Sequence, residues 1–121
     1  MPTVLIVDDS PTEVHVMQEM LSRNGFETLV AEDGDSARLQ AERHIPDVIL
    51  MDVVMPGLNG FQATREISRN PQTAKIPIII VSTKDQETDR IWGIRQGAAE
   101  YLTKPVKEKD LISKIRSVVA G

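Results

Sequence analysis

The sequence predicts an α/β domain in which five strands alternate with five helices, and three observations support that prediction. Residues 4–7, 48–51 and 78–81 are continuous runs of Val, Ile, Leu and Met, as is typical of parallel strands buried on both faces. Apolar residues between these runs recur at helical spacing. Clusters of Gly, Pro, Asn and Asp separate the two kinds of segment. Right-handed crossovers would then place a parallel sheet between two layers of helices.

The first half of the chain predicts two strand–helix units. Ser10 is a favoured N-cap, and Pro11 suits the first position of the helix that follows the first strand. Gly25 ends this helix in a left-handed conformation. A second strand is predicted over 26–31 and a weaker helix over 34–44. The residues expected on the inner faces of the two helices are Val14, Met17, Leu21, Ala37 and Ala41.

The second half of the chain predicts three more units, which begin with the strand at 48–51. A turn-rich loop, Met55-Pro56-Gly57-Leu58-Asn59-Gly60, follows that strand. The elements after the loop are a helix over 61–69, a strand over 78–81, a helix over 85–96 that Gly97 stops, a strand over 100–103 and a helix over 107–120. Phe61, Thr64 and Ile67 are expected to point inward. Apolar residues also recur in the last two helices, at Ile91, Trp92, Ile94, Leu111, Ile112, Ile115, Val118 and Val119.

Length and composition indicate a single globular domain over 1–121, with no output domain. The chain has 40% hydrophobic and 26% charged residues, which is an ordinary profile for such a domain. No apolar stretch approaches roughly 18 residues, and no basic region with a cleavage site opens the chain, so neither membrane insertion nor secretion is expected. The absence of cysteine excludes disulfides and thiolate metal sites and is consistent with the cytoplasm. We expect a monomer.

The net charge of −4 argues against nucleic-acid binding, but the charge is unevenly distributed. Residues 1–83 carry 6 basic and 12 acidic side chains, whereas residues 84–121 carry 8 basic and 6 acidic side chains. The mildly basic last third could face an acidic partner, or it could be an ordinary solvated surface.

Three aspartates directly follow two of the buried runs: Asp8 and Asp9 come after the first run and Asp52 after the second. Because ligands of open α/β sheets bind at the carboxyl ends of the strands, we expect the three carboxylates to meet there. Such carboxylates repel one another unless a cation joins them or their pKa values rise. Mg²⁺ fits best, because it prefers hard oxygen ligands and keeps waters that phosphate oxygens can replace. Asp8 and Asp9 alone could instead cap a helix, so Asp52 makes the metal site the favoured interpretation.

Two further strand ends would add a hydroxyl and an ammonium group to this edge. Ser82 follows the fourth strand, and the backbone N–H of Thr83 can add a second donor. Lys104 follows the fifth strand and can hold a phosphate as a point charge. Taken singly, Ser82 and Lys104 are more simply a strand-end cap and a solvated lysine, but the combination predicts a phosphoryl site. An aspartate can form an aspartyl-phosphate, and we expect Asp52, alone after the central strand, to be the nucleophile.

In these residues the chain resembles a response-regulator receiver domain, the phosphoacceptor module of bacterial two-component signalling. The resemblance covers essentially the whole chain. The ordered set is specific, because the separations from Asp9 through Asp52 and Ser82 to Lys104 are 43, 30 and 22 residues. The resemblance implies the flavodoxin-like three-layer fold with strand order 2-1-3-4-5. The matching stretches are 4–10, 52–60, 82–83 and 104–105.

The resemblance also implies a role for each residue of the predicted site. Asp52 would be phosphorylated, and Mg²⁺ would be bound by Asp9, Asp52, the Val54 carbonyl and, mainly through water, Asp8. Ser82 would be the switch hydroxyl, and the Thr83 N–H and Lys104 would contact the phosphate. The bond before Pro105 would be cis, and the aromatic ring of Tyr101 would turn inward when the hydroxyl moves toward the phosphate. Tyr101 could also be simply a half-buried aromatic residue of the strand.

The resemblance further implies that a histidine kinase donates the phosphoryl group and that an unidentified downstream protein reads it. The chain would then be a signalling module and not a general enzyme. Val54 has no polar side chain to orient an attacking water, so we expect slow loss of the phosphate, although Lys84 could alter the rate either way. A closer resemblance, to small stand-alone receivers of the chemosensory pathway for twitching motility (type IV pili), rests on the stretches 8–13, 55–65 and 83–89.

Three alternatives stay open on the sequence alone. A Mg²⁺-dependent phosphohydrolase with an aspartate nucleophile would need a second acid two residues after Asp52, where Val54 stands. A flavin- or nucleotide-binding module of the same fold would need a phosphate-binding loop after the first strand, where two carboxylates stand instead. The chain could also be a receiver fragment of a larger regulator.

Overall fold

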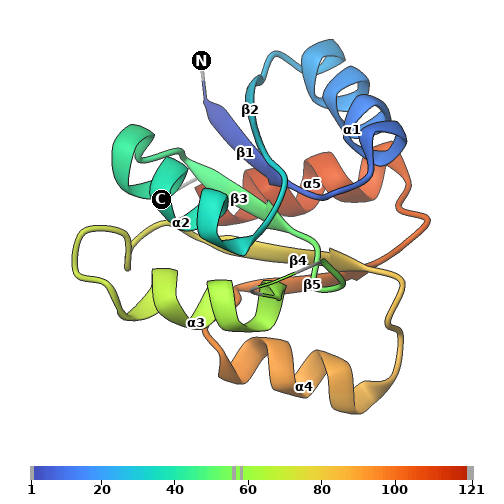
Figure 1. Cartoon of the computed structure of the whole chain (residues 1–121). Helices are drawn as coiled ribbons and strands as arrows, with labels where there is room; N and C mark the ends of the chain where they lie inside the picture. The colour runs from blue at the N-terminus through green and yellow to red at the C-terminus, as the bar shows by residue number, and fades with distance from the viewer. Residues whose placement is uncertain (1, 56, 58, 120–121) are drawn as a thin grey trace.

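The computed structural model describes residues 2–55, 57 and 59–119, in which five strands and five helices alternate (Figure 1). This confirms the predicted α/β pattern. The strands are β1 (Thr3–Val7), β2 (Glu27–Ala31), β3 (Val48–Met51), β4 (Ile78–Ser82) and β5 (Glu100–Thr103). The helices are α1 (Pro11–Arg23), α2 (Gly34–His44), α3 (Gly60–Arg69), α4 (Glu87–Arg95) and α5 (Glu108–Val119).

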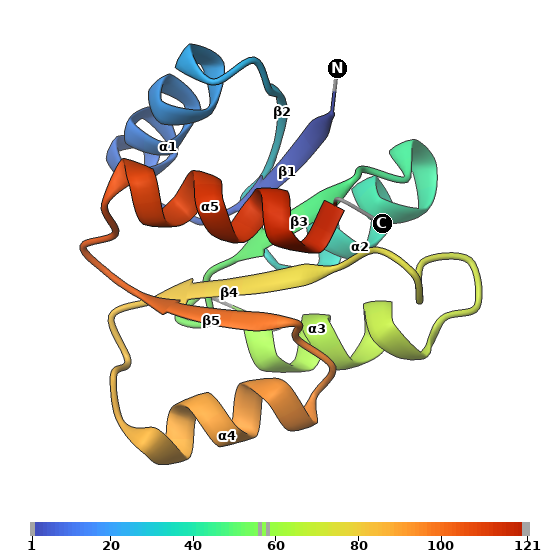
Figure 2. The same cartoon turned by 180° about the vertical axis from the view of Figure 1, so that it is seen from behind.

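All neighbouring strands pair in parallel, in the order β2-β1-β3-β4-β5 that the sequence resemblance implied. Val7 of β1 pairs with Met51 of β3, and Ser82 of β4 pairs with Thr103 of β5. The carboxyl ends of these strands therefore lie at one edge of the sheet. Helices α1 and α5 cover one face of the sheet, and α2, α3 and α4 cover the other (Figures 1 and 2).

Alternate residues of the strands supply two separate hydrophobic cores, one on each face of the sheet. Leu5, Ile49 and Ile80 belong to the core beneath α2, α3 and α4. Ile6, Leu50 and Ile79 belong to the core beneath α1 and α5. Both faces of the central strands are buried, which explains why their sequences are continuous apolar runs. The residues expected on the inner faces of the first two helices are buried: Val14, Met17, Leu21, Ala37 and Ala41.

Three helices begin one or two residues away from their predicted starts. The helix α5 begins at Glu108 and not at residue 107, and capping explains the differences at α3 and α4. The helix α3 begins at Gly60 because Asn59 is its N-cap: the Asn59 side-chain oxygen accepts a hydrogen bond from the Gln62 N–H at 3.0 Å. The helix α4 begins at Glu87, two residues later than predicted, and the Asp89 carboxylate accepts a hydrogen bond from the Gln86 N–H at 3.3 Å. The predicted end of the last helix at residue 120 and loop positions 56 and 58 lie outside the described residues.

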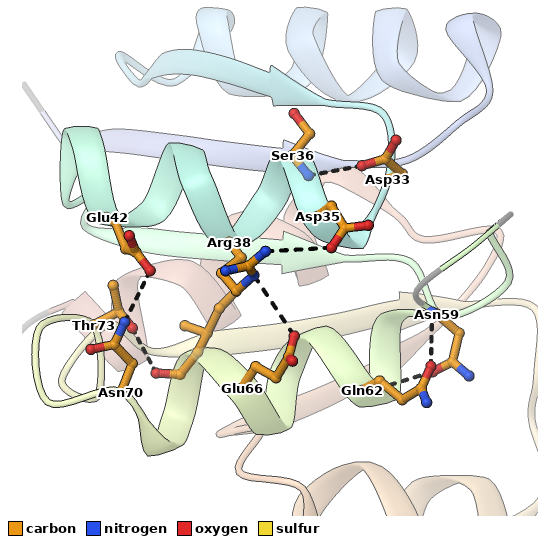
Figure 3. A network of polar contacts seen from close by, with 11 residues as sticks. Asp33, Asp35, Ser36, Arg38, Glu42, Asn59, Gln62, Glu66, Asn70 and Thr73 are labelled. Carbon is orange, nitrogen blue, oxygen red and sulfur yellow. Dashed lines mark hydrogen bonds and ion pairs between the residues drawn. The ribbon is translucent and has the colours of Figure 1, made fainter.

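Polar contacts join α2 to α3 on the outer side of their shared core (Figure 3). The Arg38 guanidinium lies between the carboxylates of Asp35, at 3.5 Å, and Glu66, at 3.9 Å. One turn further along α2, Glu42 accepts a hydrogen bond from the Asn70 side chain at 3.1 Å. The Glu66 side chain of α3 is therefore directed toward α2 and away from α4.

The helix α4 presents its large apolar residues to solvent. Ile91, Trp92 and Ile94 are 43%, 50% and 44% exposed, whereas Gly93 is the buried residue of this helix. A Cβ atom on Gly93 would lie 2.7 Å from Ile80 Cδ1 and 3.1 Å from the Tyr101 ring. The missing side chain thus lets α4 approach the sheet closely. Within the described part of the chain, no helix has the length and hydropathy needed to cross a bilayer.

Candidate functional site

Backbone hydrogen bonds carry the predicted site residues to the carboxyl edge of the sheet. The Asp52 N–H donates to the Val7 carbonyl at 2.9 Å, so Asp52 continues β3 alongside β1. The Lys104 N–H donates to the Ser82 carbonyl at 2.8 Å, so Lys104 continues β5 alongside β4. Residues that are distant in the sequence thereby meet, because each stands immediately after the paired part of its strand.

Asp8, Asp9 and Asp52 form an acidic cluster, in which one carboxylate oxygen of each lies within 4.8 Å of the others. Asp8 and Asp52 are 3% and 8% exposed, whereas Asp9 is exposed. The N-cap of α1 is Ser10, whose hydroxyl accepts a hydrogen bond from the Glu13 N–H at 3.4 Å. Helix capping therefore does not account for the two adjacent aspartates.

Lys104 places a positive charge inside this acidic cluster. Its ammonium donates to Asp8 Oδ2 at 2.8 Å and lies 3.8 Å from a Glu13 carboxylate oxygen. Burial lowers the pKa of Lys104, but the hydrogen bond to Asp8 and the charges of Asp52, Asp8 and Glu13 together raise that pKa above its ordinary value. The side chain is thus a cation at neutral pH, paired with Asp8.

The pKa of Asp52 is raised above the ordinary value for a carboxyl group. Burial is the main cause, and the negative charge of Asp8 adds to it. The Lys104 ammonium and the backbone N–H groups of Val54 and Val53 act in the opposite direction. Ionisation of Asp52 is therefore less favourable in the folded chain than for an ordinary carboxyl group. A cation bound beside Asp52 would reduce this free-energy penalty.

The donor set fits Mg²⁺. It consists of carboxylate oxygens, and three carboxylates against one ammonium leave a local charge near −2. Mg²⁺ binds oxygen ligands at about 2.1 Å, and carboxylate oxygens within 4.8 Å of one another are close enough to be recruited to one such ion. Asp8 is engaged by Lys104, which suits contact with the ion through water.

Ser82 and Tyr101 form a buried polar link beside the acidic cluster. Ser82 is fully buried, and its hydroxyl accepts a hydrogen bond from the Lys84 N–H at 3.1 Å. The Tyr101 hydroxyl donates to the Lys84 carbonyl at 2.7 Å, and Tyr101 is 7% exposed. Burial raises the pKa of Tyr101, which keeps its hydroxyl protonated as a donor. The backbone of Lys84 thus connects the predicted switch hydroxyl to the predicted switch aromatic.

The remaining predicted residues lie around the acidic cluster. The Lys104–Pro105 peptide bond is cis, as the resemblance implied. Thr83 is exposed and lines a groove that also includes Lys104 and Pro105. Val54 is 54% exposed, and its N–H donates to Asp52 Oδ1 at 3.4 Å.

Sequence reasoning missed two residues that shape the site. Glu13 approaches Lys104 from the first turn of α1, a contact that local sequence patterns do not predict. Gly60 packs directly against the backbone that carries Asp52: an added Cβ atom would lie 2.0 Å from the Asp52 carbonyl oxygen. Its place at the end of a turn-rich loop predicted a turn, and this contact depends on where α3 sits against β3.

Comparison with known proteins identifies the family of the chain. Residues 4–116 match the response regulator receiver domain. The chain belongs to this family. Membership places this receiver in two-component signalling, where such domains take phosphate from histidine kinases. The receiver fold predicted from the sequence is thereby confirmed.

Two relatives and one solved structure illustrate the similarity of this receiver to known proteins. Protein PilH of Pseudomonas aeruginosa is 55% identical, and the match covers 100% of both chains. The response regulator PleD of Caulobacter vibrioides is 37% identical over 95% of the receiver, which spans 25% of PleD. The solved structure is a receiver domain of a Pseudomonas aeruginosa sensor histidine kinase with magnesium coordinated in its active-site cleft. It superposes on this chain with a TM-score of 0.92 and 32% sequence identity, and the match covers 99% of this chain and 98% of that chain.

Replacing Lys104 with methionine is expected to strengthen Mg²⁺ binding to the receiver. The substitution removes the positive charge that pairs with Asp8, so the cluster attracts a divalent cation more strongly. Charges about 4 Å apart interact by up to a few kcal/mol near a protein surface, so we expect roughly a tenfold lower Kd. Calorimetric titration with MgCl₂ at neutral pH measures the change. Lys107→Met, at an exposed lysine nearby, is the control, and equal affinities in the two variants would contradict the expectation.

Proposed function

We propose that this chain is a phosphoacceptor response regulator, which receives a phosphoryl group from a histidine kinase on Asp52 in a Mg²⁺-dependent reaction. One observation carries the proposal: Asp52 lies beside two more carboxylates, one of which pairs with the ammonium of Lys104. Family membership supports it, because receiver domains take phosphate from histidine kinases.

In the proposed reaction, an Asp52 carboxylate oxygen attacks the phosphorus of a phosphohistidine. The new oxygen–phosphorus bond forms as the phosphorus–nitrogen bond breaks, and the electron pair of that bond returns to the imidazole nitrogen. Asp8, Asp9, Asp52 and the Val54 carbonyl would hold Mg²⁺. When bound, the ion neutralises negative charge on the transferring group. Lys104, which pairs with Asp8 before the reaction, would turn to a phosphate oxygen.

The proposed output is a shift between two conformations of the Ser82 loop. The phosphoryl group would accept hydrogen bonds from the Ser82 hydroxyl and from the Thr83 N–H. Ser82 and Tyr101 both contact the backbone of Lys84, so movement of one is transmitted to the other. The phosphoryl group shifts the population only to the extent that it favours one state. A downstream protein would read the altered surface, and no nucleic acid is involved.

We place the regulator in a cytoplasmic chemosensory pathway that controls twitching motility through type IV pili. The three sequence stretches that resemble stand-alone receivers of that pathway support this assignment. So does the 55% identity with Protein PilH, which extends over the full length of both proteins. A phosphohydrolase is disfavoured, because the position two residues after Asp52 holds the exposed apolar Val54 and not an acid.

The proposed function is tested by labelling the full chain with a phosphohistidine donor in the presence and absence of EDTA. We expect a label that needs Mg²⁺, is released by hydroxylamine as an acyl phosphate should be, and maps to Asp52 by mass spectrometry after peptide digestion. Labelling that is unaffected by EDTA, or that maps to a different residue, would overturn the proposal.

Val54→Asn is expected to shorten the lifetime of the phosphorylated state. The apolar Val54 side chain is 54% exposed beside Asp52 and offers no group that orients water, whereas an amide can hold the attacking water. Holding a reacting group in position lowers the barrier to reaction, so the decay rate of labelled protein should rise, by about tenfold. Leu39→Asn, at a 58% exposed residue of α2, is the matched control. An unchanged or slower decay in Val54→Asn counts against the water-positioning argument.

A further inference from the structure

The seam between α3 and α4 carries a hollow that is separate from the acidic cluster. This hollow has a volume of about 310 Å³. The two helices lie side by side on the same face of the sheet (Figures 1 and 2). The turn that follows α4 packs closely on α3, because Gly97 has no side chain: a Cβ atom there would lie 2.2 Å from the Ser68 hydroxyl oxygen. The residues that line the hollow are Asn59, Phe61, Gln62, Arg65, Trp92 and Gln96.

Trp92 is the most conspicuous residue of this seam. It is the single tryptophan of the chain, and half of its surface is exposed. Phe61, across the hollow, packs against the core beneath α3 and is only partly buried. Two partly exposed aromatic side chains thus line the hollow. Tryptophan is highly buried on average, and tryptophan and arginine are enriched among the residues that dominate binding energy at interfaces.

Three arginines of α3 and α4 lie in the hollow or within one helical turn of a residue that lines it. Arg65 lines the hollow, Arg69 follows one turn later on α3, and Arg95 follows Trp92 by three residues on α4. All three are exposed, and in the ranges 2–55, 57 and 59–119 none of them forms an ion pair within 4.0 Å. By contrast, Arg23 and Arg38 pair with carboxylates of neighbouring elements.

None of the acidic residues of α3 and α4 lines the hollow. Glu66 of α3 faces Arg38 on α2 (Figure 3). On α4, Asp89 precedes Trp92 by three residues, one turn toward the start of the helix, where its carboxylate accepts the hydrogen bond from the Gln86 N–H. Glu87 precedes Trp92 by five residues, which places it about 140° around the helix. On a chain of net charge −4, the seam is therefore a local basic surface with an aromatic centre.

From this arrangement we infer that the α3–α4 seam docks an acidic segment of a partner protein, which inserts an aliphatic or aromatic side chain between Phe61 and Trp92 and places carboxylates against Arg65, Arg69 and Arg95. Charge complementarity identifies the occupant, because the unpaired arginines favour a negatively charged segment over a neutral or basic one. The small hollow fits one anchoring side chain, as in a transient signalling contact. The inference rests on the proposed function, since a receiver that signals by contact needs such a surface.

The inference is tested by selecting a random dodecapeptide display library on the full chain. We expect the selected peptides to share an aliphatic or aromatic residue flanked by Asp or Glu. The consensus peptide is then titrated while the fluorescence of Trp92 is recorded, because this tryptophan lines the proposed contact. Binding should change the Trp92 emission and weaken as salt concentration rises.

Variants assign the binding to the seam. Arg65→Glu and Arg95→Glu should each raise the Kd of the consensus peptide about tenfold, whereas Arg43→Glu, at an exposed arginine of α2, should leave it unchanged. A neutral or basic consensus, the absence of any consensus, or equal losses in Arg65→Glu and Arg43→Glu would overturn the docking inference. Equal competition by polyglutamate of the same length would also overturn it. Labelling of Asp52 is assayed in parallel: if Asp52 is labelled but no acidic consensus emerges, the docking inference alone fails.

Discussion

Asp52→Asn is expected to abolish phosphorylation of the receiver by a histidine kinase or by a small phosphodonor. The amide has no anionic oxygen to attack phosphorus, and no other described carboxylate stands in the same place at the end of the central strand β3. Asp8 is held by Lys104, and Asp9 is exposed on the loop beyond β1. Incorporation of labelled phosphate should therefore fall to the level of a reaction without protein, which liquid scintillation or phosphate-affinity gels measure.

Two controls separate the loss of the nucleophile from a loss of the fold. Asp110→Asn, on the exposed side of α5, should be labelled like the unmodified chain.

Burial raises the pKa of Asp52, so the charged form of this carboxylate is less stable in the folded chain than in the unfolded one. In Mg²⁺-free buffer at neutral pH, Asp52→Asn should therefore increase the free energy of unfolding. The gain should shrink as the pH falls into the range where the carboxyl is protonated. Full labelling of Asp52→Asn would contradict the assigned nucleophile.

The sheet and the clustering of the site were predictable because the physical causes act on the sequence directly. A strand that is buried on both faces must be apolar throughout, so β1, β3 and β4 are visible as uninterrupted runs. The first polar residue after such a run must lie at the edge of the sheet. Together with the strand order that the family resemblance implied, this rule predicted that Asp52 would meet Asp8, although 44 residues separate them in the sequence.

The orientation of α4 and the contacts within the site were not predictable in the same way. Helical spacing of Ile91, Trp92 and Ile94 predicted a helix correctly, but Gly93 is the residue that packs on Tyr101 and leaves the large side chains exposed. The Lys104 side chain is flexible and has more than one carboxylate within reach, so its pairing with Asp8 depends on the local packing. Such choices are decided by tertiary packing, which local sequence patterns do not encode.

Gly60→Ala is expected to destabilise the receiver strongly and to slow phosphorylation of Asp52. The added Cβ atom would lie 2.0 Å from the Asp52 carbonyl oxygen and 2.6 Å from Val53 Cα, and both of these are backbone atoms. A clash with backbone is relieved only when α3 or the end of β3 moves, and overpacking of this kind lowers the free energy of unfolding by about 3 kcal/mol. The same movement displaces the backbone that carries Asp52, so the labelling rate should fall as well.

Gly25→Ala provides the matched comparison for this glycine. Gly25 follows α1 with a φ of +82°, and no atom lies within 4 Å of the position of an added Cβ. An alanine there meets only the backbone penalty of the left-handed region, about 1 kcal/mol, and it lies in the turn after α1, away from Asp52. Urea unfolding of both variants measures the difference, and the labelling rate of Gly25→Ala should match the unmodified chain. Similar stability losses in the two variants would show that α3 does not press on the Asp52 backbone as closely as the structure indicates.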